Sequence, residues 1–234
     1  MIPPRPAPAH VVASALADVA TLGPFFTITV GGPADGWRAA RDGYAAGIPD
    51  LVSATAHRHG VGERSRIAAS IAQLGHAAHL WSPPLACALL HQVVPDLTEL
   101  QRQDGRPALR LPRAHGRRVD GADVHEVAAL IHRMVIEDHL RPLAAGLKIK
   151  IAGGLLWGNA ASALAEAART IADAYPALGT SAARLATAVL EIEPLRNTGR
   201  FTGPGLGFRR RSCCLYYRAP AGAHCADCAL TRGE

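Results

Sequence analysis

The chain has 234 residues, of which 49% are hydrophobic, and its formal net charge is +6. This composition supports a buried core and excludes an intrinsically disordered chain; no apolar run reaches the ~18–20 residues of a membrane span, so we expect no integral membrane protein. The positive charge is compatible with nucleic acid, an acidic protein or an anionic small molecule as partner. Aromatic residues make up 5% of the chain and offer few stacking surfaces, so we expect no nucleic-acid partner.

The first sixty residues predict one helix and one strand. Residues 1–10 are Pro-rich and predict a flexible lead-in, and residues 11–23 predict a short helix that ends before Pro24. The segment "FFTITV", Phe25 to Val30, is rich in aromatic and β-branched residues and predicts a strand. The residues from there to about position 61 are rich in Gly, Pro and Asp and predict irregular structure.

Residues 62–196 predict a helical body. Its first helix, Glu63 to Trp81, is Ala-rich with apolar residues at helical spacing, and the pair Pro83-Pro84 is expected to end it. Residues 85–93 predict a second short helix, ended by Pro95. Charges, prolines and short alternations between residues 97 and 119 predict a hairpin or an excursion from the body.

Three further helices complete the body. Pro142 is expected to end or kink the first of them, and Thr180 or Ser181 to cap the last. They span residues 123–147, 155–174 and 180–192. The sequence therefore predicts a mainly α fold with a small β element (α+β), in a single domain of residues 1–234 whose C-terminal segment, residues 205–234, contains four cysteines.

These four cysteines, Cys213, Cys214, Cys225 and Cys228, follow the pattern C-C-x10-C-x2-C. The chain begins without the apolar stretch of a secretory signal, so we expect a cytoplasmic protein, which can also lie at the inner face of the membrane. Thiols stay reduced in the cytoplasm, which disfavours a disulfide framework. The fifth, Cys87, lies in an apolar helix and is expected to be a buried structural thiol.

The spacing of the four cysteines leaves two kinds of metal site open. Cys225 and Cys228 have the spacing of zinc ligands, but the side chains of the adjacent Cys213 and Cys214 diverge and are poorly placed to bind one small ion. A 2Fe–2S cluster offers two iron atoms and tolerates this divergence better. The simplest grouping gives one iron to Cys225 and Cys228, and the other to Cys213 and Cys214.

The runs "RRSCCLYYR" and "CADCAL" resemble the C-terminal signature of the FhuF-type siderophore-iron reductases, and "LLWGNAASAL" resembles a stretch in the helical body of that family. The resemblance covers roughly the last eighty residues. It implies a 2Fe–2S cluster on Cys213, Cys214, Cys225 and Cys228, and cytoplasmic reduction of ferric siderophores, typically of the hydroxamate type.

Other candidate residues surround the signature. Arg209, Arg210 and Arg211 could raise the potential of a cluster or attract an anionic substrate, and with Trp157 and Asn159 they are our candidates for substrate binding. No Gly-rich motif lies between a strand and a helix, so we expect no bound NAD or flavin. Electrons would come from an external donor, such as a ferredoxin or a flavin reductase.

Two alternatives remain at this stage: a zinc-stabilised basic module that binds nucleic acid or protein, and a 2Fe–2S electron carrier or sensor without a siderophore site. The histidines His125, His132 and His139 recur every seven residues. This spacing is too wide for a shared metal ion, so we expect satisfied or surface histidines rather than ligands.

Overall fold

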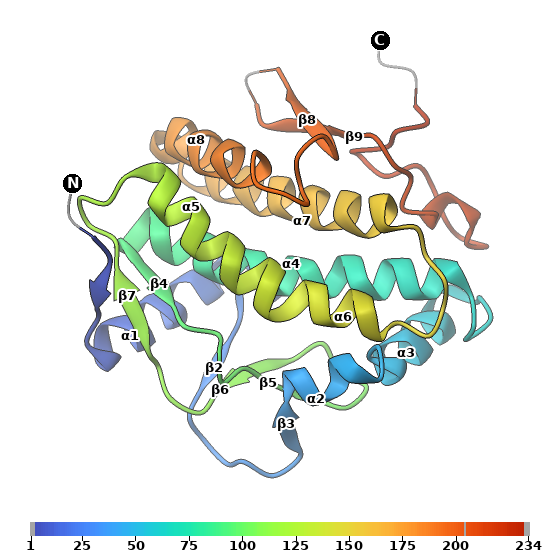
Figure 1. Cartoon of the computed structure of the whole chain (residues 1–234), viewed down its shortest axis with the longest axis horizontal. Helices are drawn as coiled ribbons and strands as arrows, with labels where there is room; N and C mark the ends of the chain where they lie inside the picture. The colour runs from blue at the N-terminus through green and yellow to red at the C-terminus, as the bar shows by residue number, and fades with distance from the viewer. Residues whose placement is uncertain (1–2, 204, 232–234) are drawn as a thin grey trace.

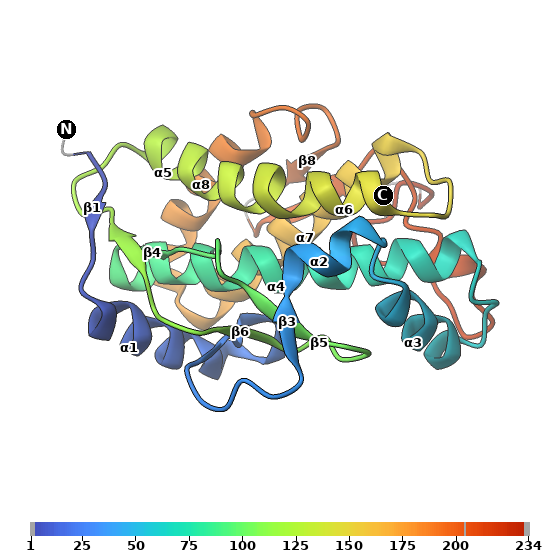
Figure 2. The same cartoon turned by 60° about the horizontal axis from the view of Figure 1, so that its bottom comes forward.

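The computed structural model describes residues 3–203 and 205–231 and confirms the α+β class. Its centre is a pair of long helices in contact, α4 (Arg66–His91) and α7 (Gly153–Ala174). Figures 1 and 2 show α4 running across the molecule. The C-terminal segment lies on one side of it, and the four-stranded sheet described below lies on another. None of the helices within the described residues combines the length and the apolar character that a membrane span requires.

Helix α4 corrects the expectation that Pro83 and Pro84 end a helix. The helix passes through both prolines to His91, so the two short helices predicted here are one, and it stops where Gln92 adopts a left-handed conformation. Each proline removes one backbone donor, at a cost of about 3 kcal/mol. Trp81 and Leu85, on either side, are completely buried. Burial of two such side chains stabilises the helix by about 2–3 kcal/mol each and offsets the cost.

The β structure is larger than the sequence indicated. The expected hairpin is present as β5 (Gln101–Gln103) and β6 (Leu109–Leu111), which pair antiparallel in a sheet of order β2-β6-β5-β3. The expected strand at Phe25 to Val30 is wrong in most of its length, because Pro24–Phe26 is a 3-10 helix. Only Thr29–Val30 of that segment form a strand, β2, which pairs with β6. Strand β3 follows at Trp37–Ala39.

The expectation of a flexible lead-in is also wrong for the residues that the structure describes, because part of the lead-in forms a strand. Strand β1 (Arg5–Pro6) pairs with β7 (Gly116–Arg118), which pairs in turn with β4 (Val93–Pro95). A salt bridge of 2.8 Å between Arg5 and Asp120 adds to this attachment. Helix α1 (Ala9–Val19) then follows the prediction, with a 3-10 turn before Gly23.

Two helices occupy the stretch that was expected to be irregular, α2 (Ala40–Ala45) and α3 (Pro49–His59). The sequence carried signals for α3: proline at its first position, an acidic Asp50 in its first turn and a left-handed Gly60 after its last. Its low apolar content hid them. Helix α3 packs against α4 and forms a wall of the cavity described below.

The long helix predicted at 123–147 has the expected extent but three parts: α5 (Val124–His132), a π-helical segment Arg133–Leu140, and α6 (Arg141–Gly146). It continues past Pro142 to Gly146, so that proline does not end it. Helix α8 (Gly179–Leu190) begins before the caps expected for it, with Leu178 in the capping position. The remaining hairpin, β8 (Gly199–Thr202) and β9 (Gly207–Arg210), leads into the cysteine segment.

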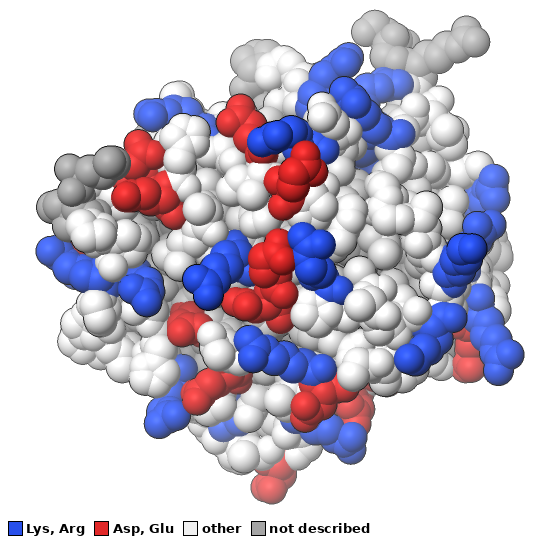
Figure 3. Space-filling view, viewed as in Figure 1, with Lys and Arg blue, Asp and Glu red and all other residues white. Residues whose placement is uncertain are grey.

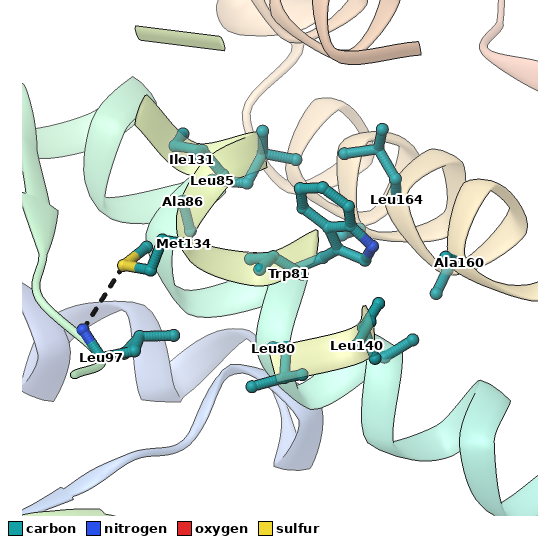
Figure 4. Packing of buried hydrophobic residues seen from close by; sticks show 14 of the residues in the cluster. Leu80, Trp81, Leu85, Ala86, Leu97, Ile131, Met134, Leu140, Ala160 and Leu164 are labelled. Atoms are coloured by element: carbon teal, nitrogen blue, oxygen red, sulfur yellow. Dashed lines mark hydrogen bonds between the residues drawn. The ribbon is translucent and has the colours of Figure 1, made fainter. Parts of the chain in front are cut away.

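The core lies between α4, α7 and the α5–α6 helix. In Figure 4, Trp81 and Leu85 of α4 lie among Ile131, Leu140 and Leu164, which come from the two neighbouring helices. The completely buried side chains on all three helices fix the position of α7 against α4. This matters for function, because both helices hold the cysteine segment.

One polar network is buried within this core. The hydroxyl of Tyr44 lies 2.8 Å from Nε2 of His76 and 3.0 Å from Nδ1 of His139, and the other nitrogen of His139 lies 3.1 Å from the carbonyl oxygen of Leu97. His139 is therefore a satisfied core histidine, as expected. His132 is buried too and His125 is exposed.

This network predicts that stability falls on mild acidification. Burial above all lowers the pKa of His139 from 6.5 to about 4. The unfolded chain takes up a proton near pH 6.5 that the folded chain does not take up until about pH 4. The neutral His139 therefore contributes fully to the free energy of unfolding above about pH 6.5, and this contribution is lost as pH falls. Between about pH 7.5 and about pH 5.5, His139 alone should lower the free energy of unfolding by about 1.4 kcal/mol.

Urea unfolding at the two pH values measures this loss. His139→Gln should show a smaller pH dependence than the wild type, whereas His125→Gln, on the same long helix but exposed, should match the wild type. The same dependence in all three proteins would contradict the assignment to His139.

Candidate metal centre and adjoining cavity

The four predicted cysteines lie in the segment that follows β9, which contacts the N-terminal half of α7 at Gly158 and Ser162. All are free thiols; Cys214 and Cys228 are buried, and Cys213 and Cys225 are half-buried. Cys87 is a free thiol as well, completely buried on α4 as expected. A 3-10 turn, Tyr216–Arg218, lies between the two halves of the cysteine motif.

One pair of thiols joins the two halves of the motif. The Sγ atoms of Cys214 and Cys225 lie 3.7 Å apart. Two thiolates on one tetrahedral metal are about 3.8 Å apart when each metal–sulfur bond is about 2.3 Å. The pair therefore has the separation of two ligands on one metal atom, and it differs from the simplest grouping, which kept Cys225 with Cys228.

The surroundings of Cys214 favour its thiolate form. Hydrogen bonding with Cys225 above all lowers the pKa of Cys214 to about 5, and the same bond raises that of Cys225, so one proton is shared by the pair. Backbone N–H groups also point at sulfur: Leu215 donates to Cys213 at 3.3 Å, and Leu230 donates to Cys228 at 3.4 Å. Such bonds stabilise thiolate ligands.

The donor set thus fits an iron–sulfur cluster: backbone N–H groups bond to two of the four thiols, Cys213 and Cys228, and the other two already have the separation of co-ligands. In residues 3–203 and 205–231, the side chains of His, Cys, Asp and Glu do not form a group of three or more that could hold a metal ion. Assembly of a cluster would bring Cys213 and Cys228 to the pair.

The contact between α7 and the cysteine segment accounts for Gly158 and Asn159 of the "WGN" sequence. A side chain at Gly158 would collide with the hydroxyl of Ser212, 2.1 Å from the position of the added Cβ. Only glycine lets the segment approach this closely. Asn159, completely buried, accepts a hydrogen bond from Arg210 and donates to the carbonyl oxygen of Ser70 at 3.0 Å.

Helix α4 holds the segment from the other side. The hydroxyl of Ser70 donates to the carbonyl oxygen of Cys214 at 2.7 Å, and Gln73 bonds to Asn159 at 2.9 Å. Residues of α4 and α7 therefore fix the backbone at one of the paired cysteines. A rigid backbone at this point limits how far the thiols move when a metal binds.

The candidates for substrate binding are placed differently from one another. Arg210 and Asn159 are buried and bind each other, a placement that does not fit contact with a substrate. Trp157 lies under the guanidinium of Arg141, whose Cζ is 5.7 Å from the ring centre. Arg209 bonds to the carbonyl oxygen of Thr231, and Arg211 is exposed.

A cavity of about 530 Å³ adjoins the cysteine segment, and Cys225 is part of its wall. This volume lies within the range of about 300–1,000 Å³ that small-molecule sites occupy. The wall is mainly apolar, and its residues come from α3, α4, α7, the 3-10 helix at Pro24, the β5–β6 turn and the cysteine loop. They include Phe25, Leu51, Ala54, Ile71, Leu74, Gly75, Ala78, His79, Ala163, Cys225 and Ala226.

Polar side chains also line this cavity, and they include Arg58, Glu166 and Asp227 as well as His79. His79 is 7% exposed, and its ring centre is 4.8 Å from that of Phe25. Burial lowers the pKa of His79 to about 4, so the imidazole is neutral, and its Nδ1 has no hydrogen-bond partner among residues 3–203 and 205–231. Asp227 is buried and bonds to Ser162, with Arg169 at 3.6 Å. The wall thus combines an apolar surface with the neutral imidazole of His79 and with charged groups of both signs.

Sequence reasoning missed the residues of this cavity. Most of them are unremarkable apolar side chains, and the ones on α3 belong to a helix that was not predicted. One signal was present: Gly75 interrupts an Ala-rich helix, where a glycine costs about 1 kcal/mol relative to alanine. In the structure an added Cβ at Gly75 would meet no atom within 4 Å, so this glycine faces open space.

The paired thiols, the N–H···S bonds and the supporting helices are compatible with an iron–sulfur site. Residues 210–230 match the family model described as the FhuF 2Fe-2S C-terminal domain, and the match includes all four cysteines. It confirms the resemblance to the FhuF-type family over these residues, and it supports an iron–sulfur protein of the siderophore-iron reductase kind. Among curated proteins, none matches the chain.

Proposed function

We propose that this chain is an iron–sulfur oxidoreductase that reduces a ferric siderophore in the cytoplasm, with the siderophore bound in the cavity beside Cys225. The observation that carries the proposal is that one residue belongs to both places. Cys225 pairs with Cys214 in the metal centre and lines the cavity. A ligand in the cavity would therefore lie next to the metal centre, with no protein layer between them.

The chemistry needs few protein groups. Hydroxamate or catecholate oxygens are hard ligands that hold Fe(III) far more tightly than Fe(II), so one added electron turns a tight complex into a weak one and releases Fe(II) with the intact ligand. When bound, a 2Fe–2S cluster on Cys213, Cys214, Cys225 and Cys228 supplies that electron. The tasks of the chain are to hold the complex and to exclude water, which the apolar wall does.

The cavity favours a neutral complex, which supports a hydroxamate siderophore as substrate. Three hydroxamates cancel the charge of Fe(III), whereas three catecholates leave a trianion. Burying an unpaired ion in an apolar wall costs several kcal/mol. Among the described residues, the cavity wall has one arginine, Arg58, against two carboxylates, Glu166 and Asp227, and His79 is neutral at ordinary pH, so the wall has no excess of positive charge to balance a trianion.

Electrons would come from a separate donor, because we expect the chain to bind neither NAD nor flavin. In Figure 3, Lys and Arg predominate along the upper and right margins of this face, beside the C-terminal segment, while both signs mix elsewhere. A basic surface of this kind would attract an acidic donor such as a ferredoxin. A flavin reductase is the alternative donor.

Metal analysis after anaerobic purification separates this proposal from the zinc-stabilised module. A brown protein with visible charge-transfer absorption and about two irons per chain, with equal sulfide, is the expected result. A colourless protein that contains one zinc would contradict the proposal.

Binding of a gallium(III) tris-hydroxamate to the oxidised protein separates a reductase from a simple electron carrier. Gallium(III) has nearly the size of Fe(III) but accepts no electron under these conditions, so binding is measured without reaction. Saturable binding with one site per chain is expected. A protein with a full cluster that does not bind the gallium complex would be a carrier or sensor.

A further inference from the structure

Arg210, the last residue of β9, is a cation in the interior of the protein. It is 2% exposed and is among the largest fully buried side chains. Its Nη2 donates to Oδ1 of Asn159, but Nε and Nη1 have no hydrogen-bond partner in residues 3–203 and 205–231. A guanidinium stays protonated in proteins, so this is a full positive charge with unsatisfied donors.

No carboxylate in the described part of the chain forms an ion pair with Arg210. Asp227 is close along the backbone, since its carbonyl oxygen accepts from the Arg210 amide at 3.2 Å. Its side chain, however, is directed to Ser162 and Arg169. A buried charge without an opposite charge costs several kcal/mol. At Arg210 this cost arises close in sequence to Cys213 and Cys214.

The groups that can balance the charge are the thiolates. Hydrogen bonds connect Arg210 to the paired cysteines: Asn159 accepts from Arg210 and donates to the hydroxyl of Ser70, and that hydroxyl donates to the carbonyl oxygen of Cys214. The guanidinium is held there by Asn159, which is itself fixed by Ser70 and Gln73 of α4. The hydrogen bond to Asn159 leaves Nε and Nη1 of Arg210 without partners in residues 3–203 and 205–231.

We propose that Arg210, positioned by Asn159, is the buried counter-charge of the iron–sulfur cluster and raises its reduction potential. Reduction adds one negative charge to the cluster, and a fixed cation in a low-dielectric interior stabilises that form more than the oxidised one. The inference rests on the iron–sulfur part of the proposed function and is independent of the substrate. Arg210 is a positioning and tuning residue and does not touch the siderophore.

Redox titration of the cluster, followed by visible absorption, tests the inference without any substrate. Arg210→Gln should lower the midpoint potential of the cluster. The equilibrium constant for its reduction should fall at least tenfold, which corresponds to about 59 mV for a one-electron couple. Arg200→Gln is the matched control, because it removes the same charge from the exposed side chain of a residue on the paired strand β8. It should leave the potential unchanged. A wild-type potential in Arg210→Gln would overturn the proposal.

A second variant covers the case in which Arg210→Gln no longer holds a cluster. Arg210→Lys keeps the charge and loses the planar donors. Retention of the cluster in Arg210→Lys, with a potential close to wild type, would support the counter-charge role. Loss of the cluster in both variants would overturn it, because the shape of the guanidinium and not its charge would then be essential. A wild-type protein without any cluster would instead refute the proposed function.

Discussion

Cys214→Ser is expected to purify as a colourless protein with at least about a tenfold loss of iron. Replacing even an outer partner of a metal ligand costs about 10–100-fold in affinity, and Cys214 would itself be a ligand. It is buried, it lies 3.7 Å from the Cys225 sulfur, and its backbone is fixed by Ser70. A serine hydroxyl is a poor ligand for the cluster iron, and its shorter bond does not reach the same position. The measurement is iron and sulfide content with the visible spectrum.

The matched control is Cys87→Ser. Cys87 is also a buried free thiol, but it lies on α4 outside the cysteine segment, so this variant should keep the full cluster even if it is less stable. Serine at position 213, 225 or 228 should lose the cluster as well. A full cluster in Cys213→Ser or Cys214→Ser would refute the assignment of these ligands.

Gly75→Leu is expected to block the cavity while the cluster stays intact. An added Cβ at this position meets no atom within 4 Å, and Gly75 lines the cavity, so the new side chain would occupy space meant for the ligand. Steric overlap of this kind costs about 1–3 kcal/mol, which is about a 5- to 150-fold rise in the Kd of the gallium(III) hydroxamate. Leucine is also a better helix former than glycine, so the fold should not weaken.

Gly154→Leu is the matched control for this variant. Gly154 lies in α7, is exposed, and its Cβ would also meet nothing within 4 Å, but it is not part of the cavity wall. It should bind the gallium complex like the wild type. Wild-type affinity in Gly75→Leu, with iron content unchanged, would show that the substrate binds elsewhere.

The sequence predicted the parts of the fold that depend on local pattern. The helix at 155–174 and the long helix at 123–147 follow from apolar spacing, and both are present as α7 and α5–α6. It failed at Pro83 and Pro84, where a local rule says that a helix ends. The buried contacts of Trp81 and Leu85 offset the cost of the prolines, and those contacts are made with distant parts of the chain.

The same distinction applies to the site. The four cysteines are readable from the sequence because their chemistry is carried by residue type and spacing. The cavity is not, because its wall is assembled from six separate elements, each contributing ordinary side chains. Arg210 appeared in the sequence as one of three basic residues beside the cysteines. Its burial and its bond to Asn159, about fifty positions away, required the packing of β9 on α7.

Single-turnover mixing tests the central claim most directly. The protein is reduced chemically under anaerobic conditions and mixed with a ferric tris-hydroxamate in the presence of an Fe(II)-specific chelator. Visible absorption then follows the cluster, and the chelate follows the iron. Our account predicts that the cluster reoxidises and that one Fe(II) is trapped for each electron lost, more slowly in Gly75→Leu at limiting substrate. A cluster that stays reduced, with no Fe(II) trapped, would contradict it.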